Sequence, residues 1–247
     1  MGMLSFSKKR TTQSMIYSKE LFDSLMGRIE GAWSDKITVS NLVTRMLVQK
    51  MNYDEAMNSL GNGNYLDNSR ILAIYDNLSR KIKSKCPTIK SDLLVPAGID
   101  EYPLLLNPWN GGRIVQNMID INDNNVLDGL NEQKCRGNIR NMYLYPMGIV
   151  LCSGGNHSQF AALQKHNGRT VIIWAYDFTD MYTTIRFDGK GFYRTDNRKK
   201  NYLVECTEDR VAFCAGVLFE IGRINLINGY KKDEWEQICA KKASHSP

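Results

Sequence analysis

Apolar residues recur every three or four positions through the first third of this 247-residue chain. This spacing places them on one face of a helix, and it marks three segments: residues 14–33, 37–51 and 67–82. A Gly-Asn-Gly-Asn sequence at 61–64 separates the second segment from the third, which Asp67 or Asn68 can cap. The pattern predicts a helical region that ends near Cys86 and Pro87.

Beyond residue 87 the apolar residues gather in short runs, which are typical of strands. These runs are residues 93–96, 103–106, 142–145, 149–152 and 171–176. The runs at 142–145 and 149–152 flank Pro-Met-Gly and predict a hairpin, and a second hairpin is predicted over 181–194. A helix is expected at 113–121, followed by a polar loop at 122–138.

The last long element is predicted to be a helix that starts after Thr207 and ends at Gly229. Apolar residues surround most of its circumference, so we expect it to be buried. A short amphipathic segment, centred on Trp235 and Ile238, follows at 231–242.

The expected fold class is α+β: a mixed sheet with helices, preceded by a helical region and followed by a long C-terminal helix. Two domain organisations fit this order of elements. Residues 1–87 form a unit of their own beside an α+β domain at 88–247, or the two parts make one continuous compact domain. The apolar stripes of the helices favour packing, because each stripe must be covered by another element.

Composition narrows the class of protein. Hydrophobic residues make up 43% of the chain and charged residues 23%, as in ordinary globular proteins, and no apolar run approaches the ~20 residues of a membrane span. No apolar stretch follows the basic residues at 8–10, so we expect no signal peptide, no membrane partner and a cytoplasmic location. The net charge of +6 is compatible with a polyanionic partner and equally with a solvated basic surface.

The six cysteines are scattered along the chain, at positions 86, 135, 152, 206, 214 and 239. They form no Cys-x-x-Cys pair, and no histidines cluster with them, so the spacing of a zinc site is missing. We therefore expect reduced thiols and no resident metal ion.

The stretch with the most chemical content is Ser-Gly-Gly-Asn-His-Ser at 153–158, which we call the box. An apolar strand precedes it and a short helix, stopped by Asn-Gly at 167–168, follows it. Glycines permit a turn between strand and helix, and the free N–H groups at a helix start attract anions. The sequence therefore predicts an anion site at the box.

The residues from Gly155 to Gly168 resemble the signature of the ParB/sulfiredoxin-like superfamily, in which a glycine ends a strand and a polar box opens a helix. The sequence Leu-Asn-Pro-Trp at 106–109 resembles the Asn-Pro segment ahead of the first helix of such domains. The resemblance covers about residues 95–178 and suggests a divergent member from a bacterium or mobile element. It implies five phosphate-binding residues, which are Gly154, Gly155, Asn156, His157 and Ser158.

The chain departs from that superfamily at the end of the box, where the usual arginine is Ser158. An arginine gives a bidentate charged contact to phosphate, whereas serine gives one neutral hydrogen bond. Triphosphate binding then needs a cation from elsewhere in the chain: Arg113, Arg136, Arg140 or Arg169. Cys152 does not match the sulfiredoxin cysteine, which lies inside the box, so we do not expect sulfiredoxin chemistry.

Two residues are candidates for catalysis. His157 either contacts phosphate and acts as a general acid or base, or it only caps its helix or bonds a nearby carbonyl. Asp177, which follows the next strand, either holds Mg²⁺ or acts as a base near the box, or it is a turn residue.

A basic stretch near the second hairpin is the candidate nucleic-acid contact. Its residues alternate with tyrosines, so they either follow a phosphate backbone or form a solvated loop. They are Arg194, Arg198, Lys199 and Lys200.

Three functions are compatible with the sequence. The absent arginine slightly favours a ParB-like module that binds a nucleotide or nucleic-acid phosphate without turnover, in plasmid or phage-defence biology. The second is an enzyme of phosphoryl or nucleotidyl transfer, or of phosphodiester hydrolysis, that uses His157. The third is a non-catalytic protein-interaction subunit with a degenerate site. A nucleoside triphosphate with Mg²⁺ is the expected cofactor where there is one, and a protein partner or second copy is compatible with each.

Overall fold

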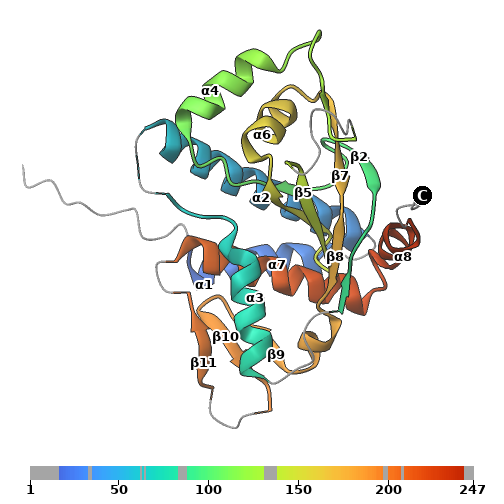
Figure 1. The fold of residues 1–247 in the computed structure, drawn as a ribbon. Helices are drawn as coiled ribbons and strands as arrows, with labels where there is room; N and C mark the ends of the chain where they lie inside the picture. The colour runs from blue at the N-terminus through green and yellow to red at the C-terminus, as the bar shows by residue number, and fades with distance from the viewer. Residues whose placement is uncertain are drawn as a thin grey trace, which may run out of the picture.

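The computed structural model describes residues 17–32, 35–61, 63, 65–82, 88–130, 138–196, 200–206 and 209–241. The fold is α+β, as the sequence predicts, with helices packed against both faces of a mixed sheet (Figure 1). The N-terminal helices are α1 (Lys19–Glu30), α2 (Lys36–Leu60) and α3 (Arg70–Lys81). Their predicted positions are confirmed, although α2 continues well beyond the predicted end at residue 51.

The central sheet has five strands in the order β1-β8-β5-β6-β3. Their bounds are β1 (Thr88–Lys90), β8 (Trp174–Asp177), β5 (Arg140–Tyr145), β6 (Ile149–Gly154) and β3 (Leu104–Leu105). The strands β5 and β6 form the predicted antiparallel hairpin, whereas β3 runs parallel to β6 and β8 runs parallel to β5. The hairpin is therefore the centre of the sheet, and the box follows directly from it.

The predicted strand at 171–176 is divided in two. The first part, β7 (Gly168–Ile172), pairs with β2 (Val95–Gly98) and β4 (Leu127–Asp128), and the second part is β8. At the break, the Ile173 N–H donates to the Asn141 carbonyl at 3.0 Å, so the chain changes sheets while its backbone stays hydrogen-bonded. The prediction of one continuous strand is wrong at this residue.

The second predicted hairpin consists of β9 (Ile185–Phe187) and β10 (Gly191–Arg194). A third antiparallel strand, β11 (Tyr202–Glu205), completes this small sheet. The residues directly ahead of β9 form a 3₁₀ helix (Thr179–Thr183) instead of the strand predicted from residue 181.

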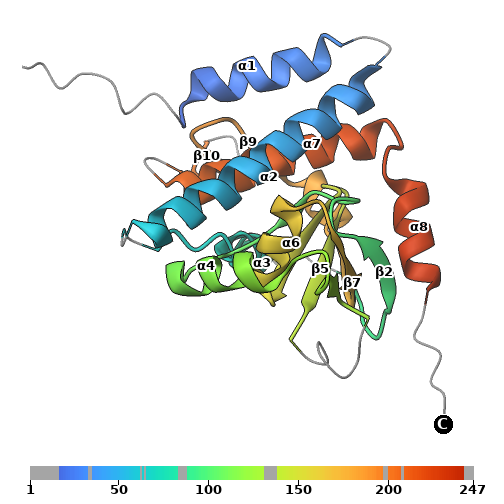
Figure 2. The same ribbon diagram turned by 90° about the horizontal axis from the view of Figure 1, so that it is seen from above.

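The C-terminal helix α7 (Arg210–Ile227) is the centre of the larger core. Nearly all of its side chains are buried, as its apolar circumference predicts, and it contacts α2, α3 and β9. Figure 2 shows α1, α2 and α7 on the same side of β5 and β7. The helices before residue 87 therefore share one core with the C-terminal helix. Asp209 caps α7 by accepting a bond from the Ala212 N–H at 3.0 Å, whereas the predicted cap, Thr207, lies outside the described residues.

Alternation along β5 separates two cores. Met142 and Leu144 point into the core around α7, whereas Tyr143 and Tyr145 point into a second core on the other face. The helices that cover this second face are α4 (Gly111–Asp120), α6 (Asn156–Gln164) and α8 (Lys232–Ala240). The sheet thus carries α4 and α6, the two helices that form the site below, on the face opposite to α7.

The start of α3 differs from the prediction. Ser69 occupies the N-cap position and makes no side-chain cap bond. Asp67 instead accepts a hydrogen bond from the Asn107 side chain at 3.2 Å, and Asn68 donates to backbone carbonyls of two other segments. Both predicted cap residues are therefore used to join elements that are distant in the sequence.

Within the described part of the chain, no single helix has the length and apolar character needed to cross a bilayer. One bent pair, α7 and α8 at 94°, meets that test by length and composition alone.

The packing of α7 makes a prediction about glycine. A Cβ on Gly216 would lie 2.4 Å from the ring of Phe187, so Gly216→Ala should destabilise the protein by about 1–3 kcal/mol. Gly27→Ala, in the exposed α1 with open space around the added carbon, should instead stabilise it by about 0.5–1 kcal/mol. Urea unfolding followed by circular dichroism measures both, and equal effects would contradict the tight contact at Gly216.

Candidate functional site

The box connects the end of β6 to the start of α6. Gly154 ends the strand, and Gly155 has a φ of 76°, in the left-handed region that favours glycine. A Cβ on Gly154 would lie 2.4 Å from the Asn138 carbonyl oxygen, so this position also requires glycine. The predicted order of strand, glycine turn and helix is confirmed. Gly155, rather than Asn156, is the N-cap, so α6 begins inside the box.

The side chains of the box are bonded to the protein, whereas its backbone donors are open. The Asn156 Oδ1 accepts a bond from the Asn107 N–H at 2.7 Å, and the Ser158 hydroxyl donates to the Gly155 carbonyl at 3.1 Å. Among the described residues no acceptor is found for the backbone N–H groups of Asn156, His157 and Ser158. These groups belong to the first turn of a helix, which provides them no partner.

His157 is nearly buried, with 7% of its surface exposed. Its Nε2 accepts a hydrogen bond from the Asn110 N–H at 3.1 Å, and its ring lies edge-on to Trp109 with ring centres 5.4 Å apart. Burial, followed by the nearby Arg113 guanidinium, lowers the pKa of His157. The imidazole is therefore neutral at pH 7 with its proton on Nδ1, and its Nε2 is already occupied. It holds the start of another helix rather than capping its own.

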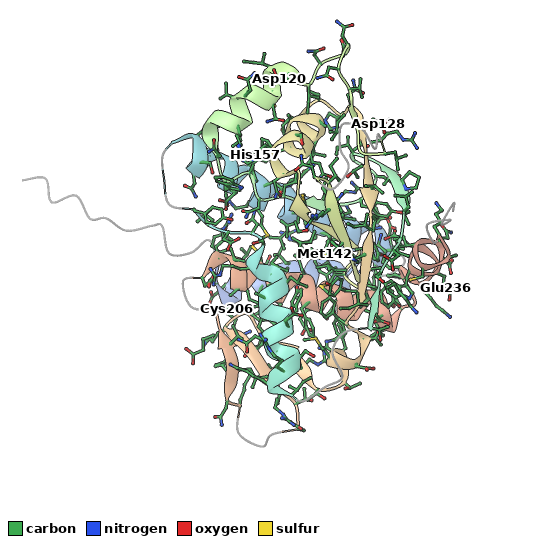
Figure 3. The ribbon with its side chains drawn as sticks, in the orientation of Figure 1. Asp120, Asp128, Met142, His157, Cys206 and Glu236 are labelled. Atoms are coloured by element: carbon green, nitrogen blue, oxygen red, sulfur yellow. The ribbon has the colours of Figure 1, made fainter. Side chains whose placement is uncertain are left out.

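A cavity of about 380 Å³ opens beside the box, and Figure 3 shows His157 close to the start of α4. We call it the α4–α6 cavity. Among the residues that the structure describes, its lining includes one cation, Arg113, and no carboxylate. The lining residues are Trp109, Arg113, Gln116, Asn117, Asn138, Ser153, Gly154, Gly155, Asn156, His157 and Ser158. All five predicted phosphate-binding residues thus lie in the wall of one cavity.

Arg113 provides the charge that the box itself lacks. It lies in the first turn of α4, and its guanidinium carbon is 5.6 Å from the centre of the Trp109 ring. It forms no ion pair with any carboxylate that the structure describes. Arg140 lies opposite Gly154 on β5 and Arg169 lies on β7, and neither lines the cavity. The fourth candidate, Arg136, is outside the described residues.

Asp177 is not brought to His157. It ends β8 beside Tyr145, whereas the box faces Arg140 at the opposite end of β5. The strand between those two ends is about 16 Å long at the usual rise per residue. The carboxylate of Asp177 accepts a bond from the Thr179 N–H at 2.8 Å, which is a turn contact. Of the two alternatives for Asp177, the position near the box is wrong, because parallel pairing of β8 with β5 carries Asp177 away from the box, and the structure shows the turn residue.

The basic residues near the second hairpin are engaged locally. Arg194 pairs with Asp196, with Nε and Oδ1 2.8 Å apart, and Lys200 pairs with Asp188. Each cation is thereby compensated by a carboxylate of its own hairpin. The other two residues predicted to contact nucleic acid lie outside the described part of the chain: Arg198 and Lys199.

Cys152 has the properties of an inert thiol. Burial raises the pKa of Cys152 to about 12, and its Sγ donates to the Gly154 carbonyl at 2.8 Å. In the residues that the structure describes, no three histidine, cysteine, aspartate or glutamate side chains gather where they could hold a metal ion.

A buried polar cluster that the sequence reasoning missed supports the box from below. The Gln159 side chain donates to the Gly154 carbonyl at 3.1 Å, and the Asn141 side chain donates to Gln159 Oε1 at 3.0 Å. The Thr170 hydroxyl also donates to Gln159. All three residues are buried. Each directly precedes an apolar run, which begins at Met142, Phe160 or Val171, and a polar residue next to a buried run is the signal by which a sequence reading can find them.

The family model of a family of unknown function, DUF6710, matches residues 6–232, so the chain belongs to this family. No curated protein and no solved structure matches the chain.

The neutral state of His157 makes stability depend on pH. Because its pKa is lowered by folding, the unfolded chain binds the proton more readily, so this contribution is lost as pH falls below about 6.5. His157→Gln retains an acceptor for the Asn110 N–H but does not titrate. Urea unfolding should therefore show a larger loss of stability between about pH 7.5 and about pH 5.5 in the wild type than in this variant.

The matched control is His166→Gln, which removes an exposed imidazole just beyond the other end of α6. Parallel pH profiles for the wild type and His157→Gln would contradict a buried, neutral imidazole bonded to Asn110.

Proposed function

We propose that this member of the DUF6710 family binds the phosphate groups of a small ligand, such as a nucleotide, in the α4–α6 cavity without turnover. One observation carries the proposal. The same cavity is lined by backbone donors that have no acceptor, and by an arginine that has no carboxylate partner, among the residues that the structure describes.

The open N–H groups of Asn156, His157 and Ser158 lie at the positive end of the α6 dipole. Several donors that converge there, with no side chain of the protein accepting from them, favour an anion with several acceptor oxygens. A phosphate group has this character, and it does not require the side chains of Asn156 and Ser158, which are bonded elsewhere.

Arg113 adds a full positive charge to these partial charges. Its guanidinium can meet a phosphate in bidentate fashion, which is the contact that Ser158 cannot make. The Arg113 guanidinium lies over the Trp109 ring, and no carboxylate that the structure describes neutralises it. This arrangement supports polyphosphate binding despite the missing arginine in the box.

Binding without turnover is favoured by the state of His157. Its Nε2 accepts from Asn110, so it is not available as a base, and no carboxylate in the described lining of the cavity replaces it. A small ligand is favoured over nucleic acid by the size of the cavity, since sites for small molecules measure about 300–1,000 Å³. The ion pairs of Arg194 and Lys200 with nearby carboxylates also favour a small ligand over nucleic acid.

The order of elements supports a ParB-like origin for this site. A strand, a helix after the Asn-Pro segment, a hairpin, the box, a helix and a strand follow one another in the order that the superfamily shares. On this resemblance we propose a nucleotide-responsive role in plasmid or phage-defence biology, in the cytoplasm and together with a protein partner or a second copy.

The test is the loss of charge at the cavity. Arg113→Gln should weaken the binding of tripolyphosphate and of nucleoside triphosphates about 10-fold or more, because a hydrogen bond to a charged group contributes about 1.5–3 kcal/mol. Isothermal titration calorimetry measures the affinities. Arg28→Gln removes the same charge from the exposed α1 and should bind as the wild type does.

Equal binding by Arg113→Gln and Arg28→Gln would contradict the assignment, as would a wild type that binds none of these ligands. Chromatography of the nucleotides after incubation separates binding from catalysis. Release of a nucleoside diphosphate or monophosphate would contradict binding without turnover and show that the protein is an enzyme.

A further inference from the structure

A second cavity adjoins the proposed phosphate site and shares Trp109 with it. Its volume is about 590 Å³, and it lies between the C-terminal end of α2 and the start of α4. We call it the α2–α4 cavity. We infer that the ligand is a nucleotide whose base occupies this cavity, against Trp109, while its phosphates occupy the α4–α6 cavity. The inference rests on the proposed function and assigns the second half of the ligand.

The two cavities differ in charge as the two ends of a nucleotide do. The α4–α6 cavity has the guanidinium of Arg113 in its wall. The described lining of the α2–α4 cavity contains no charged residue, and it includes the apolar side chains of Leu60 and Val115 and the ring of Tyr65. A charged phosphate chain suits the first, and an uncharged planar ring suits the second.

Trp109 stands at the boundary as a surface for stacking. Trp109 is 49% exposed, although its ring contacts the His157 ring and the Arg113 guanidinium. A large exposed aromatic ring between two cavities can stack against a nucleotide base, and every base has an aromatic face that can do so.

Backbone groups at the α2–α4 junction can form hydrogen bonds with the edge of a nucleotide base. A Cβ on Gly111 would lie 2.5 Å from the Ser59 carbonyl oxygen, so α4 starts directly against the last turn of α2. The N–H groups of Gly111 and Gly112 have no acceptor among the residues described, and helix-end carbonyls of α2 lie beside them. The edge of a nucleotide base carries both hydrogen-bond donors and acceptors, so neighbouring N–H and carbonyl groups can bond to it. An inorganic phosphate chain has acceptors only.

The experiment compares tripolyphosphate with the four common nucleoside triphosphates, each with Mg²⁺, by titration calorimetry. In the wild type the preferred nucleotide should bind about 10-fold or more tightly than tripolyphosphate, because of base stacking. Val115→Trp fills the α2–α4 cavity from a residue that does not line the other cavity. It should reduce nucleotide binding to the level of tripolyphosphate, while tripolyphosphate binding stays within about twofold.

Two further variants control for shape and aromatic character. Ile119→Trp places the same large side chain on the same helix at a position that is 64% exposed and lines neither cavity, so it should bind as the wild type does. Trp109→Phe should retain most of the preference for nucleotides over tripolyphosphate, whereas Trp109→Leu should lose it.

The outcomes separate this inference from the proposed function. Equal affinities of the wild type for nucleotides and tripolyphosphate, or equal weakening of both by Val115→Trp, overturn the base site and leave the phosphate site standing. Failure of the wild type to bind either kind of ligand overturns both.

Discussion

Two hydrogen bonds between side chains of α6 and the backbone of residues 107–110 determine the geometry of the site. Asn156 accepts from the Asn107 N–H and His157 accepts from the Asn110 N–H, so the first turn of α6 holds the segment that leads into α4. Because Asn110 in turn caps α4, two helix starts are fixed relative to each other. Arg113 lies three residues after Asn110, in the first turn of α4, so its position follows from this anchoring. The cavity between the two helices follows from it as well.

The same anchor is continuous with the core. The Asn68 N–H donates to Asn107 at 3.2 Å, and Asn68 accepts from Arg210, at the start of α7, at 2.8 Å. Arg210 also pairs with Asp54 on α2 at 3.0 Å. These partly buried polar contacts join the segment that leads into α4 to α2, α3 and α7, so the site and the N-terminal helices depend on one another for their positions. A ligand that moves α4 would act on α2 and α7 through this chain of bonds.

The parts of the fold that follow from local physics were predictable. Helical spacing located α1 to α3 and α7, and the apolar runs around Pro-Met-Gly located the β5–β6 hairpin that leads into the box. The failures depend on tertiary pairing. The break at Ile173 arises because β7 and β8 pair with different sheets, and Asp177 is remote because β8 runs parallel to β5. Nothing in its spacing singled out Arg113 from three other arginines, since its place in the cavity is set by two bonds that join residues 49 and 47 positions apart.

The side chains of the box therefore have a different role from the one that their chemical types suggest. Histidine, asparagine and serine in a glycine-rich loop indicate a reactive or ligand-binding set, yet His157 and Asn156 are accepting backbone bonds that hold α4 in place. Under the proposed function, the ligand is bound by backbone groups that no side-chain motif records, namely the amides of α6 and, at the α2–α4 junction, those of Gly111 and Gly112. Backbone donors tolerate changes of side chain so long as the glycines and the two anchoring bonds persist. Under the proposed function, the arginine that the box lacks is replaced by Arg113, which the anchored α4 presents to the same cavity.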